Sequence, residues 1–209
     1  MPQPPILRIT EIFPSVQGEG LRQGEPTIFI RLTGCNLNCS FCDTKYAWKG
    51  GKPHSAARTL EEIKKIRQGF QADWVCLTGG EPLLQDLTEL AEGLKKEGFQ
   101  IQVETNGILY RDLPVDWYSV SPKPENYDYR PEYREKAKEV KIIVIKELNI
   151  EPIRRLRKEF PQEIPIVLQP QSNRKWSMSL GMKLFNQAAK KGLKNIRLSC
   201  QLHKIYGLR

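Results

Sequence analysis

The sequence has no run of about 18 consecutive apolar residues, the length that crosses a bilayer, so we expect no membrane span. Its first residues, MPQPP, lack the basic and apolar regions of a signal peptide. Internal repeats and low-complexity linkers are also absent, and 209 residues are enough for one sizeable core. We therefore expect a single domain over residues 1–209, located in the cytoplasm.

Cysteine is scarce, with five residues, an odd number. Cys35, Cys39 and Cys42 lie too close together in sequence to be one another's disulfide partners in an ordinary fold. Cys76 and Cys200 stand alone in apolar-leaning segments, so we expect both to be buried core thiols. This usage does not indicate a disulfide framework and agrees with a cytoplasmic protein.

The chain carries a formal charge of +9 and a pI near 9.3, which first suggests a nucleic-acid partner. The basic residues, however, alternate with acidic ones, as in residues 61–67 and 132–139. Such mixed runs are typical of solvated helix faces. A basic balance also suits a small anionic substrate, and we favour that interpretation over nucleic acid.

The spacing C-x3-C-x2-C of Cys35, Cys39 and Cys42 supplies three metal ligands where a closed site needs four. An iron–sulfur cluster on these residues would keep one iron without a protein ligand, where a small molecule can bind and react. The spacing thus favours a catalytic cluster. His54, twelve residues after Cys42, could instead complete a Cys3His zinc site, and the cysteines alone leave that alternative open.

Strand-like and helix-like segments alternate along the chain, which favours a mostly parallel sheet. Helices are predicted from a capping box at Thr59–Glu62 to about residue 68, and over about 83–97, 151–160 and 179–190. Strands are predicted at 6–13, 27–33, 74–78, 100–104, 116–120, 140–145, 165–170 and 196–199.

Polar motifs stand at the carboxyl ends of four predicted strands, where parallel barrels build their active sites. Arg31 also interrupts an apolar strand, and a charge there is costly unless it is paired. We interpret Arg31 as either a rim residue or an anion-binding group. The four motifs are Thr78–Glu81, Glu104–Asn106, Ser121–Lys123 and Gln169–Gln171.

The cysteine loop and the segment that ends the strand at 74–78 together resemble the radical S-adenosylmethionine (SAM) superfamily. The first is the three-cysteine loop with Phe41 before its last cysteine, and the second is Leu77–Pro82, with the sequence LTGGEP. The resemblance implies a [4Fe-4S] cluster on Cys35, Cys39 and Cys42, with SAM bound to the fourth iron. It also implies an α/β fold, a partial, incomplete TIM-like barrel of mostly parallel strands.

Within the superfamily the chain resembles the 7-carboxy-7-deazaguanine synthase family. The resemblance implies a lyase that converts 6-carboxy-5,6,7,8-tetrahydropterin to 7-carboxy-7-deazaguanine with loss of ammonia, in queuosine biosynthesis, a tRNA modification pathway. It further implies Mg²⁺, a homodimer, and an external electron donor such as a flavodoxin or ferredoxin, with no direct nucleic-acid partner. The matching segments are Glu11–Phe13, Ser15–Gly20, Phe29–Arg31, Gly34–Leu37, Cys42–Thr44, Thr78–Pro82, Val103–Gly107, Ser121–Lys123 and Gln201–Lys204.

The same resemblance assigns roles to residues. The magnesium ligand is Thr44. Substrate-binding positions are Val16, Gln17, Gly18, Arg31, Thr78, His203 and Arg209. SAM-binding positions are Phe41, Cys42, Asp43, Gly80, Glu81, Glu104, Ser121, Pro122, Lys123, Gln169, Pro170, Gln171 and Ser172. Arg209 ends the chain where some family members contact the substrate through a terminal proline.

Two other functions stay open. A radical SAM activase, which makes a glycyl radical on a partner enzyme, shares the C-x3-C-x2-C spacing. Such an activase needs a surface for a protein and no pterin carboxylate site, so Gln17, Arg31 and Thr44 discriminate against it. The third candidate is a basic, zinc-containing nucleic-acid module.

Overall fold

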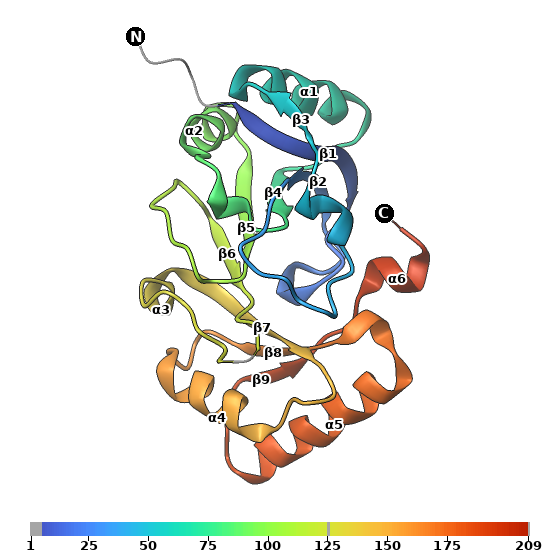
Figure 1. Cartoon of the computed structure of the whole chain (residues 1–209), viewed down its shortest axis with the longest axis vertical. Coiled ribbons are helices and arrows are strands. Elements are labelled where there is room, and N and C mark those ends of the chain that lie inside the picture. The colour runs from blue at the N-terminus through green and yellow to red at the C-terminus, as the bar shows by residue number, and fades with distance from the viewer. Residues whose placement is uncertain (1–5, 125, 209) are drawn as a thin grey trace. The chain divides into compact units, whose positions relative to one another are not determined.

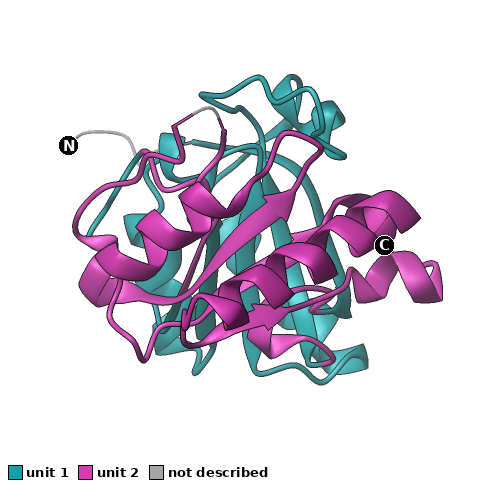
Figure 2. Cartoon of the chain, turned by 90° about the horizontal axis from the view of Figure 1, so that it is seen from below, with its two compact units in different colours: residues 1–16, 25–105, 109–117 teal, residues 17–24, 106–108, 118–209 magenta. Residues whose placement is uncertain are grey.

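The computed structural model describes residues 6–124 and 126–208, and these form two compact units. The first unit holds the chain up to residue 16 together with residues 25–105 and 109–117. The second holds residues 17–24, 106–108 and the chain from residue 118 onward (Figure 2, teal and magenta). Each unit is described separately below.

The first unit is built on a sheet with the strand order β3-β1-β2-β4-β5 (Figure 1). These strands are β1 (Leu7–Val16), β2 (Pro26–Leu32), β3 (Lys52–His54), β4 (Trp74–Gly79) and β5 (Gln100–Thr105). Strand β1 runs antiparallel to β2 and β3, whereas β4 runs parallel to β2 and β5. Strand β2 places Ile28, Ile30 and Leu32 in the core and keeps Arg31 half-buried on its other face, as the two-residue period of a strand requires.

Helices α1 (Ala56–Gly69) and α2 (Thr88–Lys96) pack against each other in this unit. A side chain at Gly93 of α2 would clash with Leu60 of α1, so glycine permits the close approach. The predicted capping box at Thr59 is wrong. Ser55 caps α1 instead, because its Oγ accepts from the Arg58 amide at 3.2 Å, while Thr59 is buried inside the first turns.

The predicted helix over residues 83–97 is also wrong at its start. Residues Pro82–Leu84 form a short 3-10 helix, η3, and α2 begins only at Thr88. The Asp86 carboxylate accepts from both the amide and the hydroxyl of Thr88, at 3.1 and 2.7 Å. An acidic side chain that binds the backbone two residues ahead favours a turn over a continuing helix.

The second unit holds a sheet with the order β6-β7-β8-β9, in which neighbouring strands run parallel. Its strands are β6 (Trp117–Val120), β7 (Ala137–Val144), β8 (Ile166–Pro170) and β9 (Ile196–Leu198). Helices α4 (Ile150–Glu159) and α5 (Lys175–Lys190) pack on each other and on this sheet. The buried Arg157 guanidinium donates to the Phe160 and Ile164 carbonyls just beyond α4, which fixes the end of that helix.

Several elements escaped prediction. Helix α5 begins at Lys175 rather than near 179, and its fully buried Ser177 donates to the Val144 carbonyl at 2.6 Å. Strand β3 and the helices η1 (Gly20–Arg22), η2 (Lys45–Trp48), α3 (Tyr133–Lys136), η4 (Gln171–Asn173) and α6 (Leu202–Tyr206) were not predicted, because none is long enough to show a period in the sequence.

The predicted placing of the polar motifs is confirmed. Thr78–Glu81 stands at the carboxyl end of β4, Glu104–Asn106 at that of β5, Ser121–Lys123 after β6 and Gln169–Gln171 at the end of β8. Among the described residues, no helix has both the length and the apolar character needed to cross a membrane.

Candidate active site

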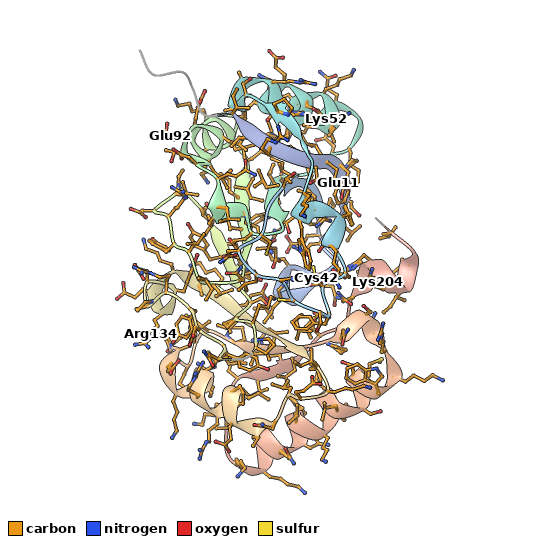
Figure 3. The ribbon with its side chains drawn as sticks, viewed as in Figure 1. Glu11, Cys42, Lys52, Glu92, Arg134 and Lys204 are labelled. Atoms are coloured by element: carbon orange, nitrogen blue, oxygen red, sulfur yellow. The ribbon has the colours of Figure 1, made fainter. Side chains whose placement is uncertain are left out.

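The cysteine loop leaves β2 at Gly34 and is closed at its base by backbone hydrogen bonds. The Gly34 amide donates to the Ala47 carbonyl in η2 at 2.9 Å, and the Cys42 amide donates to the Cys39 carbonyl at 3.2 Å. Gly34 has a φ of +101°, a conformation that side chains rarely adopt. The three cysteines thus project from a compact loop whose two ends are held together, and Figure 3 marks Cys42 within it.

All three cysteine side chains are half-buried, and none forms a disulfide. Burial raises the pKa of the Cys35 thiol; the Leu37 amide lowers it, and the negative charges of Glu81, Cys39 and Cys42 raise it again. Iron clusters are bound by thiolates, so three free, half-buried cysteines on one short closed loop fit the group that the sequence predicts.

Among the residues that the structure describes, no group of three or more His, Cys, Asp or Glu side chains is gathered around a single ion position, and this holds for the three cysteines as well as for His54. The position of His54 is what bears on the zinc alternative. His54 lies on β3 instead, with Nδ1 3.9 Å from Glu62 Oε2 of helix α1. Burial lowers the pKa of His54, and the charge of Arg58 lowers it further.

Gly79 and Gly80 bring the end of β4 against the cysteine loop. A side chain at Gly79 would clash with the Leu32 carbonyl, and one at Gly80 would clash with the Gly34 carbonyl and approach Cys35 Cβ. The Gly80 amide donates to the Leu32 carbonyl at 3.2 Å, and the Glu81 amide donates to the Gly34 carbonyl at 2.7 Å. The GGE motif therefore supports the start of the cysteine loop directly.

Glu81 is fully buried behind these glycines. Its Oε1 accepts from the Leu83 amide at 3.1 Å and from Thr105 Oγ1 at 2.9 Å, which joins the ends of β4 and β5. Glu104 lies beside Thr105 on β5 and accepts from Gln102 Nε2 at 2.8 Å. The SAM-binding roles of Glu81 and Glu104 stay predictions.

Glu11, Arg31 and Thr78 form a row across three neighbouring strands. Glu11 of β1 is the register partner of Arg31 in β2, and Arg31 is the register partner of Thr78 in β4. Register partners on adjacent strands present their side chains on the same face. The sheet therefore brings Arg31 and Thr78, two of the predicted substrate-binding residues, side by side near the carboxyl ends of their strands. It adds Glu11, which Figure 3 labels.

Arg31 is held through one edge of its guanidinium group. Nε donates to Glu11 Oε1 at 2.7 Å, and the group lies over the Phe13 and Tyr46 rings at 5.6 and 5.8 Å from their centres. Its two Nη groups have no hydrogen-bond partner among the described residues. A guanidinium group that is fixed at Nε and open at Nη is suited to bind a carboxylate with two parallel hydrogen bonds.

Thr44 and Asp43 follow the last cysteine. Thr44 Oγ1 lies 3.7 Å from Cys42 Sγ and 3.3 Å from Asp43 Oδ1, and Asp43 is exposed. A hydroxyl and a carboxylate are oxygen ligands of the kind that Mg²⁺ prefers. The roles of Phe41, Asp43 and Thr44 stay predictions.

In the second unit, the predicted substrate loop contacts the end of the chain. A side chain at Gly18 would clash with the His203 ring, and the Leu202 amide donates to the Gly18 carbonyl at 2.8 Å. The structure thus places Gly18 against His203, and the substrate-binding roles of the two residues stay predictions. Val16 ends β1 in the first unit, and Arg209 lies outside the described residues.

Charged residues of β7 hold the same loop. The buried Lys141 donates to Glu19 Oε2 at 2.9 Å, and Glu139 Oε2 accepts from the Leu21 amide at 2.7 Å. Burial raises the pKa of Glu19, but the charge of Lys141, hydrogen bonds from Gln201 and Lys141, and the charge of His203 together lower it to about 2. Glu19 is therefore ionised at any physiological pH.

The predicted SAM segments of the second unit contain one unsatisfied buried group. Gln169 is fully buried, and neither its Oε1 nor its Nε2 has a hydrogen-bond partner among the described residues. Leaving such a group unpaired is costly, so it indicates a ligand at the end of β8. Ser121 is buried and accepts from Lys123 Nζ at 2.6 Å, and Ser172 has a positive φ of +49°.

Sequence reasoning missed Glu11, Glu19, Glu139 and Lys141. A signal existed for Lys141, because it interrupts the apolar run at residues 140–145 as Arg31 interrupts its own strand. Of the two isolated cysteines, Cys76 is buried as predicted. The prediction for Cys200 is wrong, since Cys200 is half-buried and its Sγ accepts from Gln23 Nε2 at 3.3 Å.

Comparison with known proteins gives this arrangement a class. A model of the radical SAM superfamily matches residues 29–173, so the chain is a radical SAM enzyme, with SAM and a [4Fe-4S] cluster as its cofactors. The 7-carboxy-7-deazaguanine synthase of Aquifex aeolicus is 35% identical over 213 residues, which cover 98% of this chain and 95% of that protein. The synthase of Escherichia coli K12 is 35% identical over 220 residues, covering 94% and 96%.

A solved structure agrees with these relatives. The crystal structure of QueE from Escherichia coli matches with a TM-score of 0.78 at 33% identity, covering 95% of each chain. The chain belongs to the 7-carboxy-7-deazaguanine synthase family. The predicted fold class, α/β with an incomplete TIM-like barrel of mostly parallel strands, is confirmed by this match.

Proposed function

We propose that the chain converts 6-carboxy-5,6,7,8-tetrahydropterin to 7-carboxy-7-deazaguanine, with contraction of the ring and loss of ammonia. Membership in the synthase family over nearly the whole chain supports this reaction. The observation that carries the proposal is the row of Glu11, Arg31 and Thr78. This row presents an open guanidinium group beside a hydroxyl, which is the recognition that a carboxylated substrate needs.

The residues of the row divide the work. Arg31 binds the substrate carboxylate through its two Nη groups, and Glu11 fixes the guanidinium through Nε. The Thr78 hydroxyl, which has no hydrogen-bond partner among the described residues, donates to or accepts from the substrate. Positioning of the substrate in this way supplies a large part of the reduction in activation free energy in many enzymes.

The cofactors are held by the neighbouring segments. Cys35, Cys39 and Cys42 hold the [4Fe-4S] cluster, and the GGE motif supports their loop. When bound, the cluster and SAM supply the one-electron chemistry that removes a hydrogen atom from the substrate. The residues proposed to bind SAM are Phe41, Cys42, Asp43, Gly80, Glu81, Glu104, Ser121, Pro122, Lys123, Gln169, Pro170, Gln171 and Ser172.

The substrate-binding set is completed by Val16, Gln17, Gly18, His203 and Arg209. Thr44 is the proposed protein ligand of Mg²⁺, with the remaining positions filled by water and substrate oxygens. A lone hydroxyl suits this ion, because Mg²⁺ keeps several waters and takes few protein ligands.

We further propose the cellular setting that the family implies. The chain acts as one domain, since it passes between its two units several times. It works as a homodimer in the cytoplasm, where an external donor such as a flavodoxin or ferredoxin reduces the cluster, and its product enters queuosine biosynthesis for tRNA modification. A reducing compartment suits five cysteines that form no disulfide.

The glycyl-radical activase is the second candidate, and Arg31 argues against it. An enzyme whose substrate is a protein backbone has no use for a fixed guanidinium group with both Nη groups open. The test is anaerobic incubation of the reconstituted enzyme with reductant, SAM, Mg²⁺ and the carboxytetrahydropterin. Mass spectrometry should detect the deazaguanine acid and an equal amount of ammonia. Steady cleavage of SAM with the pterin unconsumed would contradict the proposal.

A further inference from the structure

Gln201 has three of its four hydrogen-bonding groups occupied by described residues. Its backbone amide donates to Asn173 Oδ1, and its carbonyl accepts from Asn173 Nδ2, both at 2.8 Å. Its side-chain Nε2 donates to Glu19 Oε1 at 2.7 Å. The remaining Oε1 is buried and has no hydrogen-bond partner among the described residues, in a residue that is 5% exposed.

The orientation of this amide is fixed by chemistry. Glu19 is ionised, because Lys141 and Gln201 stabilise its carboxylate, and an ionised carboxylate can only accept hydrogen bonds. The amide nitrogen must therefore face Glu19, which makes the unpaired atom an oxygen. Gln201 thus offers a buried acceptor that is not satisfied within the described chain.

The backbone that holds Gln201 is strained. Ser172 and Asn173 are adjacent non-glycine residues with φ of +49° and +51°, a conformation that costs free energy and persists where the surrounding structure demands it. Both Oδ1 and Nδ2 of Asn173 form hydrogen bonds with the Gln201 backbone. Such strain is common at binding sites, where it pre-organises a group for its ligand.

The surroundings of Gln201 are those of the proposed substrate loop. Leu202, the next residue, donates to the Gly18 carbonyl, and Gly18 lies against the ring of His203. Glu19, which fixes the Gln201 amide, follows Gly18 directly. A buried acceptor at this position suits a ligand that carries N–H donors, as the aminopyrimidinone ring of a pterin does.

We propose that Gln201 is a substrate-specificity residue, whose Oε1 accepts a hydrogen bond from the exocyclic amine of the pterin ring. Asn173 and Glu19 are positioning residues that hold the Gln201 amide in place. The inference rests on the proposed function, because it takes a carboxylated pterin as the ligand of this site. A site built to satisfy such a donor rejects analogues that lack it.

The test uses equilibrium binding to the reconstituted holoenzyme rather than turnover. Two fluorescent probes differ at one position: 6-carboxypterin carries the amine, and 6-carboxylumazine has a carbonyl oxygen there. Wild type should bind 6-carboxypterin about 10- to 100-fold more tightly, the effect of one buried hydrogen bond. Gln201→Met should weaken the binding of 6-carboxypterin by a similar factor and largely remove the preference for it over 6-carboxylumazine.

Gln23→Met is the matched control. Among the described residues, Gln23 Nε2 donates to the Gly18 carbonyl, the Cys200 carbonyl and Cys200 Sγ, so it supports the same loop. This variant should keep the preference between the probes. The inference is overturned if Gln201→Met keeps the preference as well, or if wild type has none. If Gln201→Met fails to fold, Asn173→Ala takes its place, because it releases the Gln201 backbone. This variant should reduce the preference, and an unchanged preference would overturn the inference.

The outcome separates this inference from the proposed function. Amine-dependent binding that requires Gln201, in an enzyme that makes no deazaguanine, would uphold the specificity role and overturn the reaction. Deazaguanine formation with no difference between the two probes would uphold the reaction and overturn the role of Gln201.

Discussion

Glu11 and Arg31 face each other across the antiparallel strands β1 and β2, and Arg31 Nε donates to Glu11 Oε1 over 2.7 Å. The Arg31 side chain is 15% exposed and the Glu11 side chain 13% exposed, so solvent screens this pair less than an ion pair on the surface. The contact uses one edge of the guanidinium and keeps the other edge open. The ion pair with Glu11 therefore stabilises the charge of Arg31 within the sheet and keeps the two Nη groups available for a substrate carboxylate.

Replacement of Arg31 should separate substrate turnover from SAM cleavage. Arg31→Ala should lower kcat/KM for the carboxytetrahydropterin by about 100-fold or more, since a charge-assisted pair to a carboxylate is lost. Cleavage of SAM without substrate should stay within about twofold, because Arg31 addresses the pterin. The measurement is product and 5′-deoxyadenosine by chromatography.

Arg8→Ala is the control for that experiment. Arg8 lies on β1 in the same unit, is exposed, and donates to the Gly50 carbonyl at 3.2 Å. It should behave as wild type. An equal fall in both activities of Arg31→Ala would show that Arg31 serves the fold or the cluster instead of the substrate.

Glu11→Gln should raise KM several-fold with little change in kcat. The amide can still accept from Arg31 Nε but no longer carries the charge that orients the guanidinium. Tyr46→Phe removes only the hydroxyl that donates to Glu11 Oε1 at 3.0 Å, and Tyr46 is exposed, so its effect should be smaller. Initial rates over a range of pterin concentrations measure both. A KM that does not change in Glu11→Gln would remove Glu11 from the binding row.

Gly80→Ala should lower the iron content of the reconstituted protein. A methyl group there would clash with the Gly34 carbonyl and push the first cysteine of the loop away. Gly69→Ala in α1 is the control, because a side chain at that position meets nothing within 4 Å and alanine favours the helix. Iron and sulfide assays would decide. Full iron content in Gly80→Ala would contradict the support that the GGE motif gives to the loop.

Lys141→Met should destabilise the protein by about 1–3 kcal/mol, because the half-buried Glu19 carboxylate loses its charged hydrogen-bond partner. Adding Glu19→Gln should restore part of this loss, because the unpaired carboxylate is then gone. Anaerobic denaturant unfolding followed by tryptophan fluorescence gives both values. A strictly additive double variant would refute the coupling of Lys141 and Glu19.

The pH dependence of that coupling has a definite sign. The folded state lowers the pKa of Glu19 from 4.5 to about 2, so the unfolded chain binds the proton more readily. The stabilisation is therefore present above about pH 4.5 and lost as the pH falls through about 2. The measured coupling should be equal at pH 6 and pH 8.

The sequence predicted the features that depend on period or on topology. Compact apolar strands such as β4 were predicted correctly. The carboxyl ends of four strands were also found, because each is marked by a change from apolar to polar residues. Arg31 was predicted because a charge inside an apolar strand is costly unless it is paired or binds a ligand. The start of α2 was missed, since the Asp86 side chain favours a turn that no period records.

Other site residues could not be predicted, for the same physical reason. Glu11 sits in a strand that alternates loosely, where an acidic residue looks like part of a solvated face. Gln201 and Asn173 act through a reciprocal pair between residues 28 positions apart, which only the fold brings together. Gln169 was predicted through the family resemblance alone, and its unpaired amide is visible only in the structure.

The central claim is that three cysteines hold a cluster with one iron open to SAM. The most direct measurement is electron paramagnetic resonance of the anaerobically reconstituted, dithionite-reduced protein, recorded before and after SAM is added. The account predicts the signal of a reduced [4Fe-4S] cluster that changes its g-values when SAM binds. A colourless protein that contains zinc and gives no such signal, or a cluster signal that SAM leaves unchanged, would contradict it.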